Sequence, residues 1–205
     1  MYELGVRMMT LTWNHENELA SPQRNPSGVL VPQTEKGLTG KGFEFLAEME
    51  RMHMIVDVSH LSDKGFWDIA RHGTRPFAAS HSNCRALAPH TRNLTDEMIR
   101  ALSERGGIAG LNYYAPFLDT DPTHPENCRS TVELIAKHAA HYKQVGGAQM
   151  IALGSDFDGI DGPHQLENAA FLPLLADALR KEGFTEDEVE GIYYRNAMRF
   201  FEENL

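Results

Sequence analysis

The sequence predicts an α/β fold, a partial TIM-type (β/α)8 barrel with about five βα units. Short apolar, β-rich runs alternate with amphipathic helical patterns along the chain. Three of these runs end on side chains that can bind metals or carry protons, at His60, His81 and Asp156. The longest loops follow the predicted strands, as they do at the catalytic face of a barrel. Because the carboxyl ends of parallel strands meet at one rim, we expect these three side chains to converge.

Each βα unit can be placed in turn. The predicted strands are 6–12, 55–59, 77–80, 108–114 and 150–155; the predicted helices are 41–52, 63–71, 96–106, 130–144, 165–182 and 186–203. Ser62, Thr95 and Thr185 are typical N-caps, and Gly110 indicates a crowded position inside a barrel. No linker or internal repeat divides the chain, so residues 1–205 are expected to form a single domain, the C-terminal part of such a barrel.

Composition restricts the class of protein. A net charge of -10 argues against a nucleic-acid partner, which requires a basic face. No run approaches the roughly 18 to 20 apolar residues of a membrane span, and the first residues lack the pattern of a signal peptide. The two cysteines, Cys84 and Cys128, have no metal-binding or redox spacing. We therefore expect free thiols and a cytoplasmic location.

The histidines at the strand ends indicate a metal site. His60 and His81 lie about one βα repeat apart, so their imidazoles would stand on neighbouring strands and could bind one zinc ion. Asp156, two strands further on, could bind a metal or take a proton from a metal-bound water. Arg92, in the loop after His81, could hold a substrate carboxylate.

Plainer interpretations stand beside these. A single histidine among the ten is usually structural or exposed, and Arg92 could instead pair with Asp96 at the surface. Asp158 could serve only to shape the turn after Asp156. The sequence predicts solvated side chains at His53, His72, His124, His138 and His141.

Five motifs occur in a characteristic order. They are Asp57-Val58-Ser59-His60, Ser80-His81-Ser82, Arg92-Asn93-Leu94-Thr95-Asp96, Gly110-Leu111-Asn112-Tyr113-Tyr114 and Gly154-Ser155-Asp156-Phe157-Asp158-Gly159. With these motifs, the chain resembles membrane dipeptidases (renal dipeptidase, peptidase family M19) over nearly its whole length. Leu11-Thr12-Trp13-Asn14 and Tyr194-Arg195-Asn196-Ala197 also fit the resemblance.

The resemblance implies a barrel of the metal-dependent amidohydrolase type with a binuclear zinc centre that hydrolyses dipeptides. His60 and His81 correspond to the two histidine ligands of one zinc ion. Asp156 corresponds to the acidic residue that handles protons near the other zinc ion, and Arg92 to the arginine that holds the substrate carboxylate.

The sequence also departs from the family pattern. The family has a His-x-Asp pair on its first strand and a bridging glutamate on its third, whereas the first strand of this chain matches the family's fourth. Trp13 stands where the family has a substrate-contacting histidine, and His15 lies two residues on. We therefore expect an incomplete binuclear centre and an open five-stranded arc, with exposed edges and an exposed apolar interior. A second copy in a homo-oligomer, an additional segment or a rearranged packing would have to cover it.

Three hypotheses remain open. The chain is part of a zinc-dependent dipeptidase whose activity belongs to a longer protein, or it is a non-catalytic remnant or oligomerising fragment of that fold. The third is a metal-dependent amidohydrolase with a mononuclear site.

Overall fold

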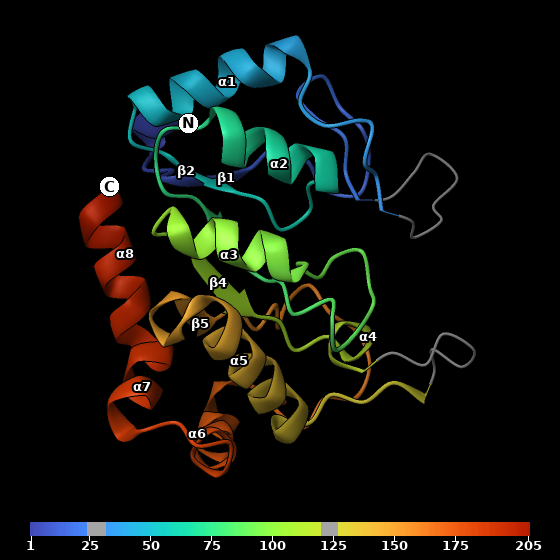
Figure 1. Cartoon of the computed structure of the whole chain (residues 1–205), viewed down its shortest axis with the longest axis vertical. Helices are drawn as coiled ribbons and strands as arrows, with labels where there is room; N and C mark the ends of the chain where they lie inside the picture. Colours follow the sequence, from blue (N-terminus) through green and yellow to red (C-terminus); the bar gives the residue numbers. More distant parts are fainter. Residues whose placement is uncertain (24–31, 120–126) are drawn as a thin grey trace.

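Five parallel strands form one sheet in a computed structural model that describes residues 1–23, 32–119 and 127–205 (Figure 1). They are β1 (Met8–Thr10), β2 (Ile55–Asp57), β3 (Ala78–Ala79), β4 (Ile108–Leu111) and β5 (Ile151–Leu153). Their order in the sheet is their order in the chain, and every pair is parallel. All five carboxyl ends therefore lie at one edge, and the predicted partial barrel is confirmed.

Helices follow the strands in βα order. The connections contain α1 (Gly40–Arg51), α2 (Asp63–His72), α3 (Asp96–Glu104), and α4 (Ala115–Leu118) with α5 (Val132–Gly146). After β5 come α6 (Leu172–Lys181), α7 (Glu186–Glu190), a π-helical turn η5 (Gly191–Arg195) and α8 (Asn196–Asn204). Short 3-10 turns within the described ranges include η1 (Tyr2–Leu4), η3 (Ala148–Met150) and η4 (Ala169–Phe171). Figure 1 shows α1, α2, α3 and α5 following one another in chain order, with α8 to one side.

Local signals explain where the helices begin. Ser62, Thr95 and Thr185 are N-caps as predicted, and Thr185 forms a complete capping box. The helix predicted over 165–182 is wrong at its start, because the side chain of Asn168 accepts a hydrogen bond from the Ala170 N–H and forms the 3-10 turn η4 instead. The strands are also shorter than predicted, since the residues after each strand turn into the loops that form the site.

The main core lies between the sheet and its helices. Alternate strand residues such as Val56, Ala109 and Ile151 are buried there with helix residues such as Ile69 and Ile135. The opposite orientation of alternate side chains along a strand explains why their neighbours form a second cluster.

The second cluster covers the inner face of the sheet. Ile55, Ala78, Ile108 and Ala152 are buried there together with Phe200 of α8. The expectation of an exposed apolar interior is therefore wrong for these four side chains, because the C-terminal helix packs over them and removes them from water.

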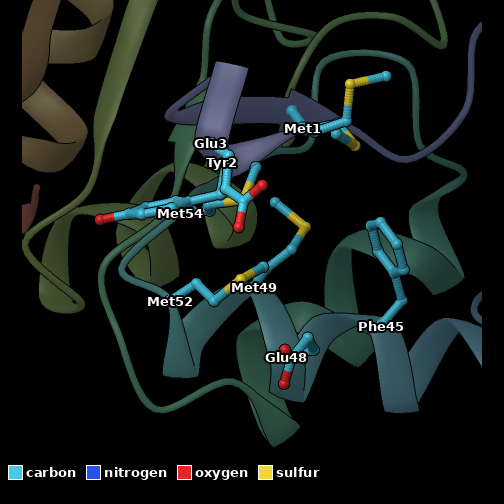
Figure 2. Close-up of a pocket in the computed structure, with 9 residues that line it drawn as sticks. Met1, Tyr2, Glu3, Phe45, Glu48, Met49, Met52 and Met54 are labelled. Atoms are coloured by element: carbon cyan, nitrogen blue, oxygen red, sulfur yellow. The ribbon is translucent and has the colours of Figure 1, made fainter. Parts of the chain in front are cut away.

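A separate apolar pocket of about 360 Å³ lies between the N-terminal turn and α1 (Figure 2). Methionine side chains dominate its lining, which consists of Met1, Tyr2, Glu3, Met9, Phe45, Glu48, Met49, Met52 and Met54. It contains none of the residues predicted to carry chemistry. Within the described residues, no helix is long and apolar enough to cross a lipid bilayer.

His138 is fully buried, so the prediction of a solvated side chain is wrong. Its Nδ1 accepts a hydrogen bond from the backbone N–H of Cys84 at 3.0 Å, and its Nε2 donates to the carbonyl of Leu118 at 3.1 Å. Burial lowers the pKa of His138 to about 4. The imidazole therefore ties the loop after β3 to α5 as a neutral group.

The other predicted solvated histidines differ in outcome. His53 and His72 are exposed, as predicted. His141 is mostly buried and its Nε2 lies 2.7 Å from Oδ1 of Asp96, so the prediction is wrong for this residue. His124 lies outside the described residues.

Candidate functional site

A cavity of about 460 Å³ opens at the carboxyl ends of the strands. It is lined by Thr10, Leu11, Thr12, Trp13, Asn17, His60, His81 and Asp156. The structure thus brings together the three side chains that the sequence predicted to converge. This convergence follows from the parallel sheet, because each residue comes a few positions after the last ladder pair of its strand.

The imidazoles of His60 and His81 are in direct contact within the cavity. Nε2 of His60 lies 2.9 Å from Nε2 of His81, and the ring centroids are 4.9 Å apart. Burial and the positive charge of Arg92 hold the pKa of His81 below its ordinary value, although Asp57 and Asp156 act in the opposite direction. His81 is therefore a neutral ring near pH 7, the form that binds metals.

The buried carboxylate of Asp57 is connected to His81 through the hydroxyl of Ser80. Asp57 Oδ2 accepts a hydrogen bond from the Ser80 hydroxyl at 2.6 Å, and the same hydroxyl lies 2.7 Å from Nδ1 of His81. Burial alone would raise the pKa of Asp57, but the hydrogen bonds from Ser80 and Ser59, together with the positive charge that His81 gains when it is protonated in acid, outweigh it and hold the pKa below its usual value. The sequence alone indicated no role for Asp57 or Ser80.

Close backbone approach places the Ser80-His81 turn. A β-carbon on Gly110 or on Gly154 would collide with the carbonyl oxygen of Ser80. Only glycine leaves room for that carbonyl against β4 and β5, so the predicted crowding at Gly110 is confirmed. The two glycines thereby allow the Ser80-His81 turn to pack closely against the ends of β4 and β5.

Asp156 is held in an unusual backbone conformation. Its φ is 62°, in the left-handed region that non-glycine residues rarely adopt. Asn112, at the end of β4, donates from Nδ2 to Oδ2 of Asp156 at 3.1 Å. Such positions concentrate at functional sites; here the strained backbone and Asn112 turn the carboxylate into the cavity beside the imidazoles. Asp158 is exposed in the turn that follows.

Arg92 lies against the histidine pair and is 4% exposed. Its Nη2 is 3.2 Å from Nε2 of His60, and its guanidinium also donates to the carbonyls of Ser59 and His81. The alternative pairing with Asp96 is wrong, because Asp96 pairs with His141 instead. The guanidinium thus supplies positive charge beside the cavity and links the loops after β2 and β3.

Other polar residues of the loop 82–94 hold it in place. The Asn83 side chain exchanges hydrogen bonds with the backbone of Asn112, and Asn93 donates to the carbonyls of Ala88 and Phe117. Arg85 forms a two-pronged ion pair with Asp63 at 2.7 and 2.8 Å. All three side chains therefore make structural contacts that fix the loop.

The nitrogen pair fits two ligands of a metal ion. Two imidazole nitrogens on a tetrahedral zinc ion lie about 3.3 Å apart, which follows from the usual Zn–N length. The observed 2.9 Å requires the rings to separate only slightly. Among the residues that the structure describes, no group of three or more His, Cys, Asp or Glu side chains is close enough to form a complete ligand set. His60 and His81 could thus hold a metal ion only together with further ligands.

A parallel βα sheet that gathers two imidazoles, a carboxylate and a guanidinium at its strand ends is typical of a barrel-type enzyme with its site at that face. The family model described as membrane dipeptidase (peptidase family M19) matches residues 1–204, and the chain belongs to this family. The family is one of dipeptidases.

Individual relatives agree with this assignment. An uncharacterized Klebsiella pneumoniae protein from the region 5′ of pqqA is 38% identical over 97% of this chain and 72% of its own length. An uncharacterized dipeptidase of Schizosaccharomyces pombe is 34% identical over 97% of this chain and 46% of its own length. A solved Rhodobacter sphaeroides metallo peptidase, liganded with a phosphinate mimic of the dipeptide L-Ala-D-Ala, is 30% identical with a TM-score of 0.88. The match covers 100% of this chain and 57% of that structure, so the chain spans little more than half of it.

Proposed function

We propose that the protein is a zinc-dependent dipeptidase in which His60 and His81 hold a zinc ion at the carboxyl ends of β2 and β3. The observation that carries this proposal is the pair of Nε2 atoms 2.9 Å apart in a cavity shared with Asp156. Bound zinc would supply Lewis-acid polarisation of the peptide carbonyl and a more acidic water. The remaining steps belong to residues of the chain.

Asp156 would move the protons. Its carboxylate, oriented by Asn112, would accept the proton of the attacking water and return it to the leaving amine nitrogen. Arg92 would bind the C-terminal carboxylate of the dipeptide, since its guanidinium adjoins His60 and a carboxylate is the group it recognises best. The selectivity for dipeptides would follow from the fixed spacing between this cation and the hydrolytic centre.

The test compares dipeptides with their C-terminal amides, using the zinc-loaded chain and a series of L,L and L,D substrates. We expect the wild type to prefer the free carboxylate, and Arg92→Lys to raise KM for the dipeptide while changing the amide little. Asp156→Asn should lower kcat by about 10²- to 10⁴-fold while zinc remains bound. Absence of dipeptide hydrolysis by the zinc-loaded wild type would contradict the proposal.

A non-catalytic role for this chain is the second candidate. It is favoured by the finding that the described residues supply no group of three metal-binding side chains. The same assay separates the two candidates, because a non-catalytic chain would leave every dipeptide intact whether or not zinc is added.

A further inference from the structure

Asp57 is surrounded by hydrogen-bond donors. Its Oδ1 accepts from the backbone N–H groups of Ser59 and Ser80 at 3.0 and 2.9 Å, and from the Ser59 hydroxyl at 2.7 Å. Its Oδ2 accepts from the hydroxyls of Thr10 at 2.8 Å and Ser80 at 2.6 Å. A carboxylate can only accept, so each of these partners must donate.

The Ser80 hydroxyl has a single hydrogen to give. Because that hydrogen points to Asp57, the oxygen of Ser80 can only accept from Nδ1 of His81, 2.7 Å away. Nδ1 of His81 must then carry the ring proton. In a neutral imidazole the other nitrogen, Nε2, is left with a lone pair, so the 2.9 Å contact in the cavity is a hydrogen bond that Nε2–H of His60 donates to Nε2 of His81.

We propose that Asp57 is a positioning residue that fixes the tautomer of His81 through the hydroxyl of Ser80. Asp57 does not reach the cavity itself, since it is 2% exposed beneath the site. It sets the direction of two hydrogen bonds in series, so that His81 presents an acceptor nitrogen to any cation in the cavity. The inference deepens the proposed zinc site and rests on it for the choice of metal, while the tautomer itself exists in the metal-free protein.

The substitution Asp57→Asn should reverse the direction of the two hydrogen bonds that connect Asp57, Ser80 and His81, which we call the relay. The two backbone N–H groups require an acceptor at the Oδ1 position, so the new amide nitrogen must take the Oδ2 position beside Ser80. It then donates to the Ser80 hydroxyl, which turns its own hydrogen toward Nδ1 of His81. His81 would carry its proton on Nε2, the nitrogen that a zinc ion needs free.

The matched control is Thr10→Val, which removes a hydrogen bond to the same Oδ2 atom but leaves the relay intact. Long-range ¹H–¹⁵N NMR of the metal-free full chain reports which ring nitrogen of His81 is protonated, and a His81→Gln spectrum assigns the signal. We expect the Nδ1–H form in the wild type and in Thr10→Val, and the Nε2–H form in Asp57→Asn. An Nε2–H ring in the wild type, or an unchanged tautomer in Asp57→Asn, overturns the inference.

Zinc affinity, measured by competition with a chromogenic chelator, gives the second readout. Asp57→Asn should weaken zinc binding by about 10- to 100-fold, the usual effect of losing the partner of a ligating histidine. If the wild type binds no zinc, the proposed function fails, and the NMR result still decides the relay.

A second pair of variants keeps the test decisive if Asp57→Asn does not fold. Ser80→Ala removes the hydroxyl that connects Asp57 to His81, and Ser80→Thr retains a hydroxyl. We expect Ser80→Ala to release His81 from the single Nδ1–H form and Ser80→Thr to restore it. A wild-type tautomer in Ser80→Ala would overturn the inference.

Discussion

Acidification should weaken the fold through the buried imidazole of His138. In the folded protein its pKa is about 4, whereas its ordinary value is 6.5. Below pH 6.5 the unfolded chain binds a proton here and the folded chain does not, so the free energy of unfolding falls as the pH decreases toward 4. At about 1.4 kcal/mol per pKa unit, the loss near pH 4 is about 3 kcal/mol. Above pH 6.5 this contribution is fully present.

Urea unfolding of the wild type and His138→Gln from neutral pH to about pH 4 measures this contribution. At neutral pH the variant should be less stable by about 1 to 3 kcal/mol, because it leaves the Cys84 N–H or the Leu118 carbonyl without its partner. The wild-type advantage should shrink with acidification, since the variant has no imidazole to protonate. The exposed substitution His15→Gln is the control and should parallel the wild type. Parallel curves for the wild type and His138→Gln would refute the reasoning.

Three further substitutions test the packing by urea unfolding at neutral pH. Gly110→Ala should cost more than about 2 kcal/mol, because its β-carbon meets the Ser80 carbonyl; a neutral effect would mean that the end of β3 is free to move. Arg85→Ala should cost about 3 kcal/mol by leaving the carboxylate of Asp63 unpaired in a largely buried position, and the double variant with Asp63→Asn should recover part of that loss. Thr185→Ala should cost about 1 kcal/mol through the lost capping box; an unchanged unfolding midpoint would show that α7 does not depend on it.

Local patterns were sufficient to predict the order of elements. The capping residues Ser62 and Thr95 mark where α2 and α3 begin, because capping involves only the neighbouring backbone. The ends of three strands placed His60, His81 and Asp156 at one rim, since parallel strands repeat their direction. The roles of these three residues in binding and catalysis stay predictions.

Contacts between distant segments could not be predicted in the same way. His138 lies on α5 between Lys137 and Ala139, and its hydrogen bonds to Cys84 and Leu118 join it to segments distant in the sequence. Asp57 was visible in the motif with His60, but its connection to His81 passes through a serine on the next strand. A buried aspartate at a strand end, followed by serines, was the available signal for such a relay.

Zinc retention by the purified chain tests the central claim most directly. The wild type, His60→Gln and His81→Gln are loaded with zinc and desalted, and bound metal is measured by mass spectrometry. The account predicts that the wild type keeps about one zinc ion per chain, the number that a single histidine pair can anchor, and that either substitution removes it. A wild type that keeps no zinc, or variants that keep as much as the wild type, would contradict the assignment of His60 and His81 as the metal-binding pair.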